Sequence, residues 1–300
     1  MPGNKTRIEE VVQVLKGLAE PTRLRLVALL GHGELTVGEI CRAVGQSQPR
    51  VSRHLRLLRE AGLLDRFREQ QRVYYRMPAT APRAGWLTEL LALMDPEDPE
   101  LQGDLGRVAT VVGDRERLAA CGLGVTAPQE PELDGLQEVL REELGCGELG
   151  ELLDIGTGSG RIVRLLGGQT RHAVGLDRSA AALRVARARL HGRGLCHCEF
   201  RRGDMYALNY AAASFDIVTI DRVLATAERP VDVLAEAARV LRRAGRLLVV
   251  DALDDLRSCS GLSPPLALRQ WLDVSGLALI RSRACALAGG QYLLALAERP

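Results

Sequence analysis

One short stretch of this 300-residue chain has the pattern of a buried strand, a glycine-rich turn and the start of a helix. Residues 152–155 (LLDI) form the short, mostly apolar run that is typical of a strand buried on both faces. Gly156, Gly158 and Gly160 follow at alternate positions, and residues 161–166 resume an apolar pattern at helical spacing. This order lets the backbone approach a ligand closely, with the N–H groups of the helix pointing at it. The stretch therefore predicts the ligand-binding turn of a doubly wound α/β domain.

The next acidic residue favours a ligand that contains a ribose. Asp177 ends a second apolar run, residues 172–176, about twenty residues beyond the turn, which is where a second strand brings a carboxylate to a ribose diol. The nicotinamide fingerprint requires a glycine at its sixth position, where this chain has Arg161. A P-loop is excluded as well, since no Gly-Lys-Ser/Thr follows the turn. Another class of nucleoside ligand is therefore predicted.

The pattern Asp-x-Gly-x-Gly-x-Gly, which begins at Asp154, resembles the first motif of class I S-adenosylmethionine-dependent methyltransferases, and the resemblance extends over residues 151–251. Residues 203–205 (GDM) match the turn that contacts adenine, 215–218 (FDIV) the fourth strand, and 241–251 (LRRAGRLLVVD) a helix end, turn and fifth strand. The resemblance implies a Rossmann-like, seven-stranded and mostly parallel sheet that binds S-adenosylmethionine or S-adenosylhomocysteine. The cofactor-binding residues that it implies are Asp154, Gly156, Thr157, Gly158, Gly160, Asp177, Arg178, Asp204, Met205 and Asp221.

Composition and charge bound the rest of the chain. Three hundred residues with 46% hydrophobic content suffice for two domains with buried cores. Because there is no apolar run long enough to span a bilayer and no signal peptide, we expect a cytoplasmic protein without a membrane partner. The seven cysteines are irregularly spaced and do not predict a disulfide framework. Residues 1–80 carry 14 Lys/Arg against 8 Asp/Glu and residues 81–300 carry 26 against 30, so only the first part is expected to bind a polyanion.

The first 80 residues show the pattern of a winged helix-turn-helix. The expected helices are residues 8–18, 21–30, 36–41 and 48–61, and the expected strands of the wing are residues 63–68 and 72–76. We expect Ser47 to cap the last of these helices, with Pro49 in its first turn. The apolar stripe of that helix is Val51, Leu55 and Leu58.

Cations and short polar groups on the same helix fit the major groove of DNA, where arginine reaches guanine edges and phosphates. The wing adds two arginines that are placed to contact the neighbouring backbone. The candidate DNA-binding residues are Ser47, Gln48, Arg50, Ser52, Arg53, His54, Arg56, Arg68 and Arg72. Any one of the arginines could instead belong to a solvated helix face, and His54 could equally pack beside the apolar stripe or contact a phosphate.

Residues 8–77 closely resemble the repressors of the ArsR family through LAEPTRLRLVALL, SQPRVSRHLRLLREAGLL and RVYYR. The resemblance implies a homodimer that reads a palindromic operator in double-stranded DNA. The metal sensors of the family carry Cys-x-Cys where this chain has Thr36 and Gly38. No histidine occurs between His54 and His172 for the second metal site of the family. We therefore expect no metal sensing at these sites.

We divide the chain into a winged-helix domain (residues 1–80), a helical linker or dimerisation segment (81–131) and a methyltransferase-like domain (132–300). Helices are expected over residues 86–94, 101–120, 133–144, 180–190, 231–241 and 265–275, a loop over 122–131, strands over 198–200, 215–220 and 247–250, and an antiparallel pair within 277–297. The helix at 86–94 would join the first helix in a dimer interface or merely pack on its own domain. Cys-His-Cys at 196–198 invites a metal site, but strand alternation sends the cysteines one way and the histidine the other.

The end of the predicted fourth strand bears on whether the second domain is an enzyme. Asp221 and the residues after it (DRVL) lack the Asn/Asp-Pro-Pro-Tyr/Phe signature of amino-methyltransferases and the Pro-Cys pair of cytosine-C5 enzymes, which disfavours DNA methylation. Small-molecule methyltransferases often have His-x-Val-Leu-His here, and Asp221 and Ala225 replace both histidines. Asp221 could act as a base, touch the methionine moiety of the ligand, or be solvated.

We therefore favour an ArsR-type transcriptional repressor whose methyltransferase-like domain is a receptor for S-adenosylhomocysteine or S-adenosylmethionine. The resemblance points to genes of the methionine and S-adenosylmethionine cycle as its targets. The fusion of the two domains and the altered strand end both favour this hypothesis. The alternative is an active S-adenosylmethionine-dependent small-molecule methyltransferase whose winged helix regulates its own operon.

Overall fold

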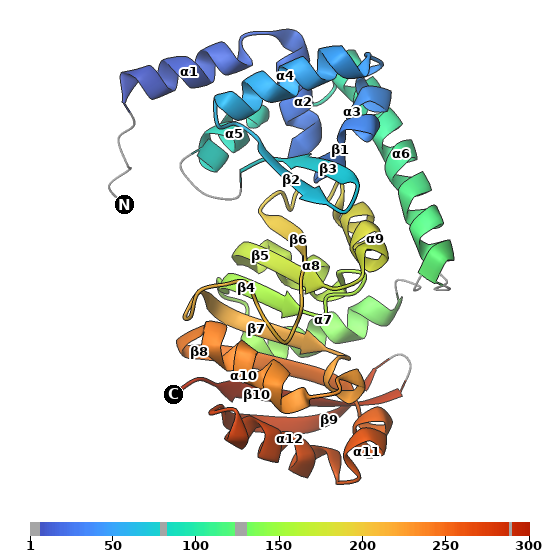
Figure 1. The fold of residues 1–300 in the computed structure, drawn as a ribbon, viewed down its shortest axis with the longest axis vertical. Coiled ribbons are helices and arrows are strands. Elements are labelled where there is room, and N and C mark those ends of the chain that lie inside the picture. The colour runs from blue at the N-terminus through green and yellow to red at the C-terminus, as the bar shows by residue number, and fades with distance from the viewer. Residues whose placement is uncertain (1–6, 79–82, 124–130, 288–289) are drawn as a thin grey trace. The chain divides into compact units, whose positions relative to one another are not determined.

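The computed structural model describes residues 7–78, 83–123, 131–287 and 290–300 (Figure 1). Contacts divide the chain into two compact units, one of residues 1–118 and 187–197 and one of residues 119–186 and 198–300. The units are cut at different places from the three segments expected above, because contacts in space define them rather than composition along the chain.

The first unit contains the expected winged helix-turn-helix (Figure 1, blue to cyan). Its elements are α1 (Ile8–Leu18), α2 (Pro21–Gly31), β1 (Leu35–Thr36), α3 (Val37–Val44), α4 (Gln48–Glu60), β2 (Asp65–Glu69) and β3 (Arg72–Arg76). The strands pair antiparallel in the order β1-β3-β2, so the short strand β1 extends the wing formed by β2 and β3. Leu63 and Leu64, which we expected to begin the wing, lie buried in the core before β2 starts.

Local sequence explains where two of these helices begin. Thr36 accepts a hydrogen bond from the Glu39 N–H, and the Glu39 carboxylate accepts one from the Thr36 N–H, which makes a complete capping box for α3. Ser47 stands at the N-cap of α4, as expected, but its side chain makes no capping hydrogen bond. The start of α4 relies instead on Pro49, whose fixed φ suits the first turn of a helix.

Two more helices of the first unit follow the wing, α5 (Arg83–Ala92) and most of α6 (Pro99–Leu123). α5 ends at Ala92 rather than at residue 94, and α6 includes residues 122 and 123, which we expected to be loop. Arg25 of α2 fixes α6, because its Nε and Nη2 donate to the two carboxylate oxygens of the buried Asp104 at 2.6 and 2.7 Å. A bidentate pair of this kind is stronger and more directional than a neutral hydrogen bond.

The second unit is built on a seven-stranded sheet with the order β6-β5-β4-β7-β8-β10-β9. The strands from β6 to β8 pair parallel, and β10 pairs antiparallel with both β8 and β9, so the predicted mostly parallel sheet is confirmed (Figure 1). The strands are β4 (Gly150–Ile155), β5 (Thr170–Asp177), β6 (Cys198–Arg202), β7 (Phe215–Asp221), β8 (Leu241–Ala252), β9 (Ala278–Leu287) and β10 (Gly290–Glu298). The α-helices that begin in this unit are α7 (Pro131–Leu144), α8 (Arg161–Leu166), α9 (Ala180–Leu190), α10 (Pro230–Val240), α11 (Leu253–Ser260) and α12 (Pro264–Val274).

β8 is longer than the predicted fifth strand. It begins at Leu241, directly after α10, and the turn that we expected between residues 241 and 247 is a bulge within the strand. The bulge is visible in the register, since Phe215 of β7 pairs with Leu241 while Ile217 pairs with Arg246. The helix α11, which follows β8 at once, was not predicted.

Apolar side chains of the central strands fill the core of the second unit. Leu153 of β4, Val218 of β7 and Val249 of β8 are each at most 1% exposed. Because these side chains are buried, they cannot contact a ligand. In doubly wound sheets the ligand binds instead at the carboxyl ends of the strands, where polar residues lie. None of the helices that the structure describes is both long and apolar enough to cross a membrane.

Candidate ligand crevice and DNA-binding face

The glycine-rich turn between β4 and α8 is built on left-handed backbone. Gly156, Gly158 and Gly160 have φ angles of 72°, 52° and 76°, which residues with a side chain rarely adopt. A Cβ atom at Gly156 would lie 2.3 Å from Val223 Cγ2, and one at Gly160 would lie 2.8 Å from Phe200 Cζ. The first glycine therefore lets Val223 lie directly against the turn, and the third lets the turn approach Phe200 of β6.

Asp177 ties this turn to the end of β5. Its Oδ2 accepts a hydrogen bond from the Gly158 N–H at 2.9 Å, and its Oδ1 accepts one from the Ser179 N–H at 2.8 Å. Each carboxylate oxygen can accept a further hydrogen bond. The side chain is therefore held in place and still able to accept from the hydroxyls of a ribose.

A cavity of about 360 Å³ lies at this end of the sheet, within the size range of small-molecule sites. Its lining residues are Gly156, Leu176, Asp177, Arg178, Gly203, Asp204, Met205, Tyr206, Arg222, Val223, Thr226 and Glu228. Five of the residues expected to bind the cofactor are in this set. The other five, Asp154, Thr157, Gly158, Gly160 and Asp221, do not line the cavity.

Asp154 lies beneath the turn rather than at its surface. It is 1% exposed, and its Oδ1 accepts a hydrogen bond from the Thr219 hydroxyl at 2.8 Å. Burial raises the pKa of Asp154 to about 7. The side chain therefore supports the sheet under the glycine turn, and a direct contact with the ligand stays a prediction.

Asp221, at the end of β7, is bound by Arg161 at the start of α8. Arg161 Nε lies 2.5 Å from Asp221 Oδ2, and Nη2 lies 2.6 Å from Oδ1. The two side chains are only 11% and 8% exposed, so Asp221 is not solvated. Because both carboxylate oxygens receive a hydrogen bond from one guanidinium, Asp221 is a poor general base.

A second carboxylate at this edge, that of Asp251 in β8, is bound by backbone N–H groups. It accepts hydrogen bonds from the N–H groups of Ala225 and Ala252 at 3.2 and 3.1 Å. Burial raises its pKa to about 6. These bonds hold the segment after β7 in place. Asp251 therefore supports the crevice without lining it.

Five lining residues that follow Met205 or Asp221 were not predicted from the sequence, namely Tyr206, Arg222, Val223, Thr226 and Glu228. The Tyr206 hydroxyl accepts a hydrogen bond from the Glu228 N–H at 3.0 Å, which joins the two segments. Arg222 is exposed and has a φ of 57°. Their position directly after assigned residues was the available signal for Tyr206, Arg222 and Val223, whereas Thr226 and Glu228 had none.

The DNA-binding candidates of the first unit lie on α4 and the wing. Ser47, Gln48, Arg50, Ser52, Arg53, Arg56, Arg68 and Arg72 are all exposed. The apolar stripe of α4, Val51, Leu55 and Leu58, is fully buried. His54 is half-buried, with Nδ1 3.5 Å from a Glu20 carboxylate oxygen, so it packs beside the start of α2. α4 thus presents its cations on the face opposite its core contacts.

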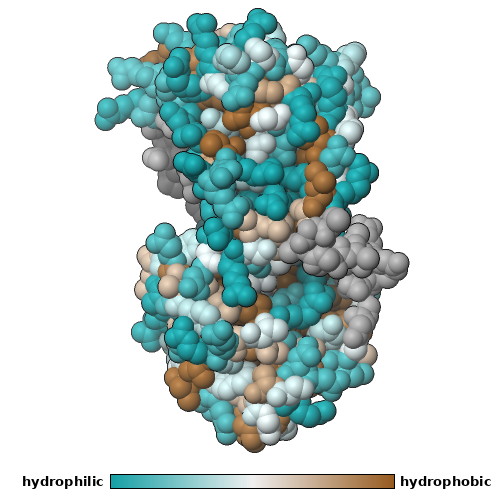
Figure 2. Space-filling view, turned by 45° about the vertical axis from the view of Figure 1, so that its right-hand side comes forward, coloured by the Kyte–Doolittle hydropathy of each residue, from teal (hydrophilic) through white to brown (hydrophobic). Residues whose placement is uncertain are grey.

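Exposed apolar side chains in the first unit gather on α1. Ile8 and Leu15 are 82% and 61% exposed, and Val11 and Val12 between them are also exposed. These positions fall on one side of a helix, at the spacing of a packing seam. On the face drawn in Figure 2, hydrophilic residues predominate and hydrophobic ones lie between them. The stripe on α1 therefore has the pattern of a surface that packs on a partner.

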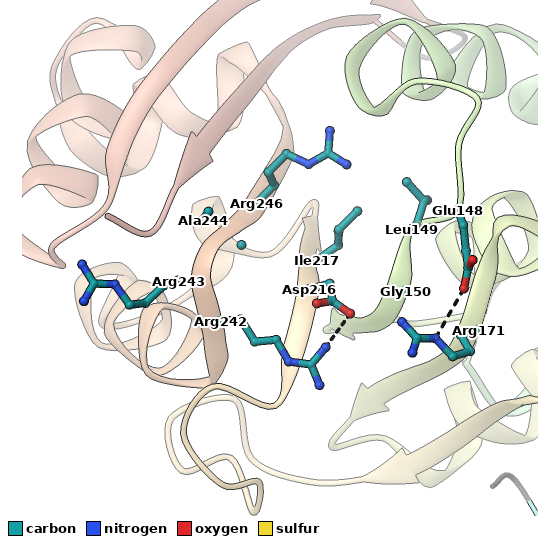
Figure 3. Close-up of a pocket in the computed structure, with 11 residues that line it drawn as sticks. Glu148, Leu149, Gly150, Arg171, Asp216, Ile217, Arg242, Arg243, Ala244 and Arg246 are labelled. Atoms are coloured by element: carbon teal, nitrogen blue, oxygen red, sulfur yellow. Dashed lines mark ion pairs between the residues drawn. The ribbon is translucent and has the colours of Figure 1, made fainter. Parts of the chain in front are cut away.

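A second cavity, of about 400 Å³, lies where β4 and β7 begin, at the opposite ends of the strands from the crevice (Figure 3). Arg242 pairs with Asp216 at 2.6 Å and Arg171 pairs with Glu148 at 3.3 Å. Figure 3 shows the Arg243 side chain pointing away from these pairs. Because Arg171 and Arg242 are paired with carboxylates and Arg246 donates to the Leu144 carbonyl, this cavity is a weaker ligand site than the crevice.

Comparisons with known proteins match both units. The family model described as bacterial regulatory protein, ArsR family, matches residues 20–66, and a methyltransferase domain model matches residues 153–249. The chain is 44% identical over 81 residues to the arsenical resistance operon repressor of Escherichia coli (strain K12), covering 27% of this chain and 68% of the repressor. This chain belongs to the ArsR family.

The fused second part of this ArsR-family protein is a class I S-adenosylmethionine-dependent methyltransferase fold. The chain is 31% identical over 176 residues to the arsenite methyltransferase of Aquipseudomonas alcaligenes, which covers 52% of this chain and 51% of that enzyme. A solved complex between the Trm112 methyltransferase activator of Haloferax volcanii and a methyltransferase matches with a TM-score of 0.50 at 20% identity, covering 63% of this chain and 97% of that one. The structural likeness shows the fold alone.

At the start of α3, where the resemblance to the metal sensors led us to compare Thr36 and Gly38 with a pair of cysteines, the Thr36 hydroxyl caps the helix. Among the residues that the structure describes, no three His, Cys, Asp or Glu side chains are grouped so that they could hold a metal ion.

Proposed function

We propose that this ArsR-family protein is an operator-binding transcriptional repressor whose methyltransferase-fold unit binds S-adenosylhomocysteine or S-adenosylmethionine as an effector. The observation that carries the proposal is the contrast between Asp177 and Asp221. Asp177 borders the cavity with both oxygens still able to accept, whereas Asp221 is engaged by Arg161. The site therefore supports binding of the nucleoside better than it supports transfer of a methyl group.

In this proposal, different residues of the crevice contact different parts of the ligand. Asp177 would accept from the ribose hydroxyls, and Asp204 with Met205 would contact the adenine. Arg178, next to Asp177, lines the same cavity. S-Adenosylmethionine, when bound, would supply a methyl group on a sulfonium for attack by a nucleophile. Such an attack needs alignment and, for a protonated nucleophile, a base, and among the residues that line the described crevice none is a histidine.

On the DNA side, the proposal is a homodimer in which α4 enters the major groove and the wing contacts the adjacent backbone. The exposed apolar stripe of α1 supports pairing with a second copy, which would place two α4 helices on the half-sites of a palindrome. A coupling free energy of about 1–3 kcal/mol between ligand and DNA would change operator occupancy some tenfold. Genes that make or consume the ligand are the proposed targets.

The alternative function is an active methyltransferase that regulates its own operon. The similarity to an arsenite methyltransferase supports it and names arsenite as an acceptor to test. The pairing of Asp221 with Arg161 and the loss of both strand-end histidines weigh against it.

The test is calorimetry of the full-length protein with each ligand, alone and with an operator selected from random duplex DNA. We expect binding of at least one ligand and a change in operator affinity of about tenfold. Operator affinity that stays the same at saturation with both ligands would exclude the effector role. Methyl transfer to arsenite or to another small acceptor would favour the alternative.

A further inference from the structure

The first unit contains a segment that lies far outside the winged-helix region predicted from the sequence. Residues 187–197 group with residues 1–118 by contacts, although more than a hundred residues separate them from the wing. The boundary between the units falls inside α9, after Ala186, so Arg187 is the first residue of this segment.

Arg187 is 2% exposed and is surrounded by groups of the winged helix. Its Nε lies 2.5 Å from a carboxylate oxygen of Glu34, and its Nη1 and Nη2 donate to the Glu69 carboxylate at 3.2 and 2.8 Å. The guanidinium carbon lies 4.5 Å from the centre of the Tyr74 ring and 5.6 Å from that of Phe67. One side chain therefore joins the segment before α3 to both strands of the wing.

The chemistry of these partners keeps Arg187 charged. Burial alone would lower the pKa of the guanidinium, but the carboxylates of Glu34 and Glu69 raise it above its usual range. Glu34 and Glu69 are themselves buried, at 5% and 7% exposure. Removing the guanidinium would leave the buried Glu69 carboxylate without its ion pair to Arg187, which is strongly unfavourable, while Glu34 would keep its ion pair with Arg76 at 3.7 Å. The wing would have to move to hydrate Glu69.

The contacts reach the part of the wing that carries its DNA-binding candidates. Glu69 ends β2, directly after Arg68, and is paired in register with Arg72 of β3. Phe67 and Tyr74 stack on each other with ring centres 5.4 Å apart. The Arg187 guanidinium binds Glu69 and packs on the Phe67 and Tyr74 rings, and it therefore fixes the position of Arg68 and Arg72.

We propose that Arg187 is a positioning residue of the DNA-binding unit, which holds the wing where its arginines meet the operator. This inference rests on the proposed function. Arg187 is carried by α9, and the Ser179 hydroxyl just before that helix accepts from the Ala182 N–H at 3.2 Å while the Ser179 N–H donates to Asp177. Asp177, the proposed ribose ligand, thus lies just before the start of α9, and Arg187 lies near the end of the same helix.

The test compares full-length Arg187→Lys and Arg187→Met with the matched control Arg189→Met. Arg189 lies two residues along the same helix, is bound to Glu116 of α6 at 2.6 Å, and makes its ion pair away from the wing. The Arg187→Lys variant keeps the charge but not the two-carboxylate fork, so it is the variant expected to stay folded. Operator affinity, its salt dependence and the footprint are measured for each, with circular dichroism to confirm folding.

We expect Arg187→Lys to weaken operator binding about tenfold and to lower the salt slope by about 1–2 as wing contacts to phosphates are lost. Protection at the bases next to the major-groove contacts should be lost as well. Arg189→Met should match the wild type within about twofold in affinity, a margin well below the tenfold step of 1.4 kcal/mol. Arg187→Lys with wild-type affinity, slope and footprint would overturn the inference.

Arg53→Ala separates this inference from the proposed function. Weak binding by Arg53→Ala together with wild-type behaviour of the Arg187 variants would overturn only the role of Arg187. Wild-type binding by Arg53→Ala would remove α4 from the interface and with it the proposed DNA-binding mode.

Discussion

Arg161 and Asp221 form a bidentate ion pair that joins the start of α8 to the end of β7. Both guanidinium-to-carboxylate distances are at most 2.6 Å, and both side chains are at most 11% exposed. The pair occupies the strand end at which a methyltransferase would place a catalytic group. The pair connects a helix to a strand end, so we expect it to stabilise the fold.

Arg161→Met should lower the free energy of unfolding by about 3 kcal/mol, because it leaves Asp221 buried without its partner. Chemical denaturation followed by circular dichroism measures the loss. Asp221→Asn keeps the shape of the side chain and should weaken binding of S-adenosylhomocysteine less than Asp177→Ala does. A larger loss in Asp221→Asn would mean that Asp221 contacts the ligand directly.

Asp177→Ala should weaken binding of S-adenosylhomocysteine about 10- to 100-fold, since charge-assisted hydrogen bonds to two ribose hydroxyls are lost. Operator affinity without ligand should stay at the wild-type level. Calorimetry gives the first quantity and fluorescence anisotropy with labelled operator the second. Asp254→Ala, at a side chain that is 91% exposed, is the control. Undiminished affinity in Asp177→Ala would show that the ribose assignment is wrong.

Arg53→Ala should weaken operator binding and reduce the slope of log affinity against log salt by about 1, because one phosphate or base contact is removed. Titrations at several salt concentrations measure the slope. Arg257→Ala, at an exposed arginine of α11 in the second unit, controls for the loss of one positive charge. Equal slopes in Arg53→Ala and the wild type would place Arg53 outside the interface.

Asp154→Asn should flatten the dependence of stability on pH. Burial raises the pKa of Asp154 from 3.8 to about 7, so between these values the folded protein keeps a proton that the unfolded chain has lost. The contribution of this group to stability is therefore present at low pH and is lost as pH rises through this window, by at most ~4 kcal/mol. Melting temperatures at pH 5 and pH 8 should differ less in the variant. A difference as large as that of the wild type would contradict the buried, protonated state of Asp154.

Leu15→Glu should dissociate the proposed dimer. Leu15 is 61% exposed at the carboxyl end of the apolar stripe of α1, and a symmetric interface would bury it twice. We expect the dimer dissociation constant to rise about 100-fold, measured by sedimentation equilibrium. Val274→Glu, on the exposed side of α12, should leave the association unchanged. A dimer that is equally stable in both variants would exclude α1 from the interface.

Much of the local structure could be predicted because it depends on neighbours in sequence. The cap at Thr36, the buried stripe of α4 and the glycine turn after β4 each follow from residues within one or two turns of chain. Element ends were less predictable. The bulge after Leu241 was expected as a turn, since only the pairing with β7 shows that the strand continues on both sides of it.

The site was partly predictable for the same reason. Asp177 and Met205 fall in short motifs and line the cavity, whereas no local motif marks Thr226 and Glu228, which line it as well. Asp154 belongs to the motif, yet it supports the sheet from below, because an inward-facing position on a central strand is buried whatever the motif around it.

The amino-acid sequence alone determined that this chain joins an ArsR-type winged helix to a methyltransferase fold, because both patterns depend on spacings of a few residues. Only the tertiary structure decided which charges meet. Arg161 reaches Asp221 across 60 residues, and Arg187 reaches Glu34 across 153. Ion pairs of this kind depend on which helix end lies beside which strand, and no local spacing encodes that.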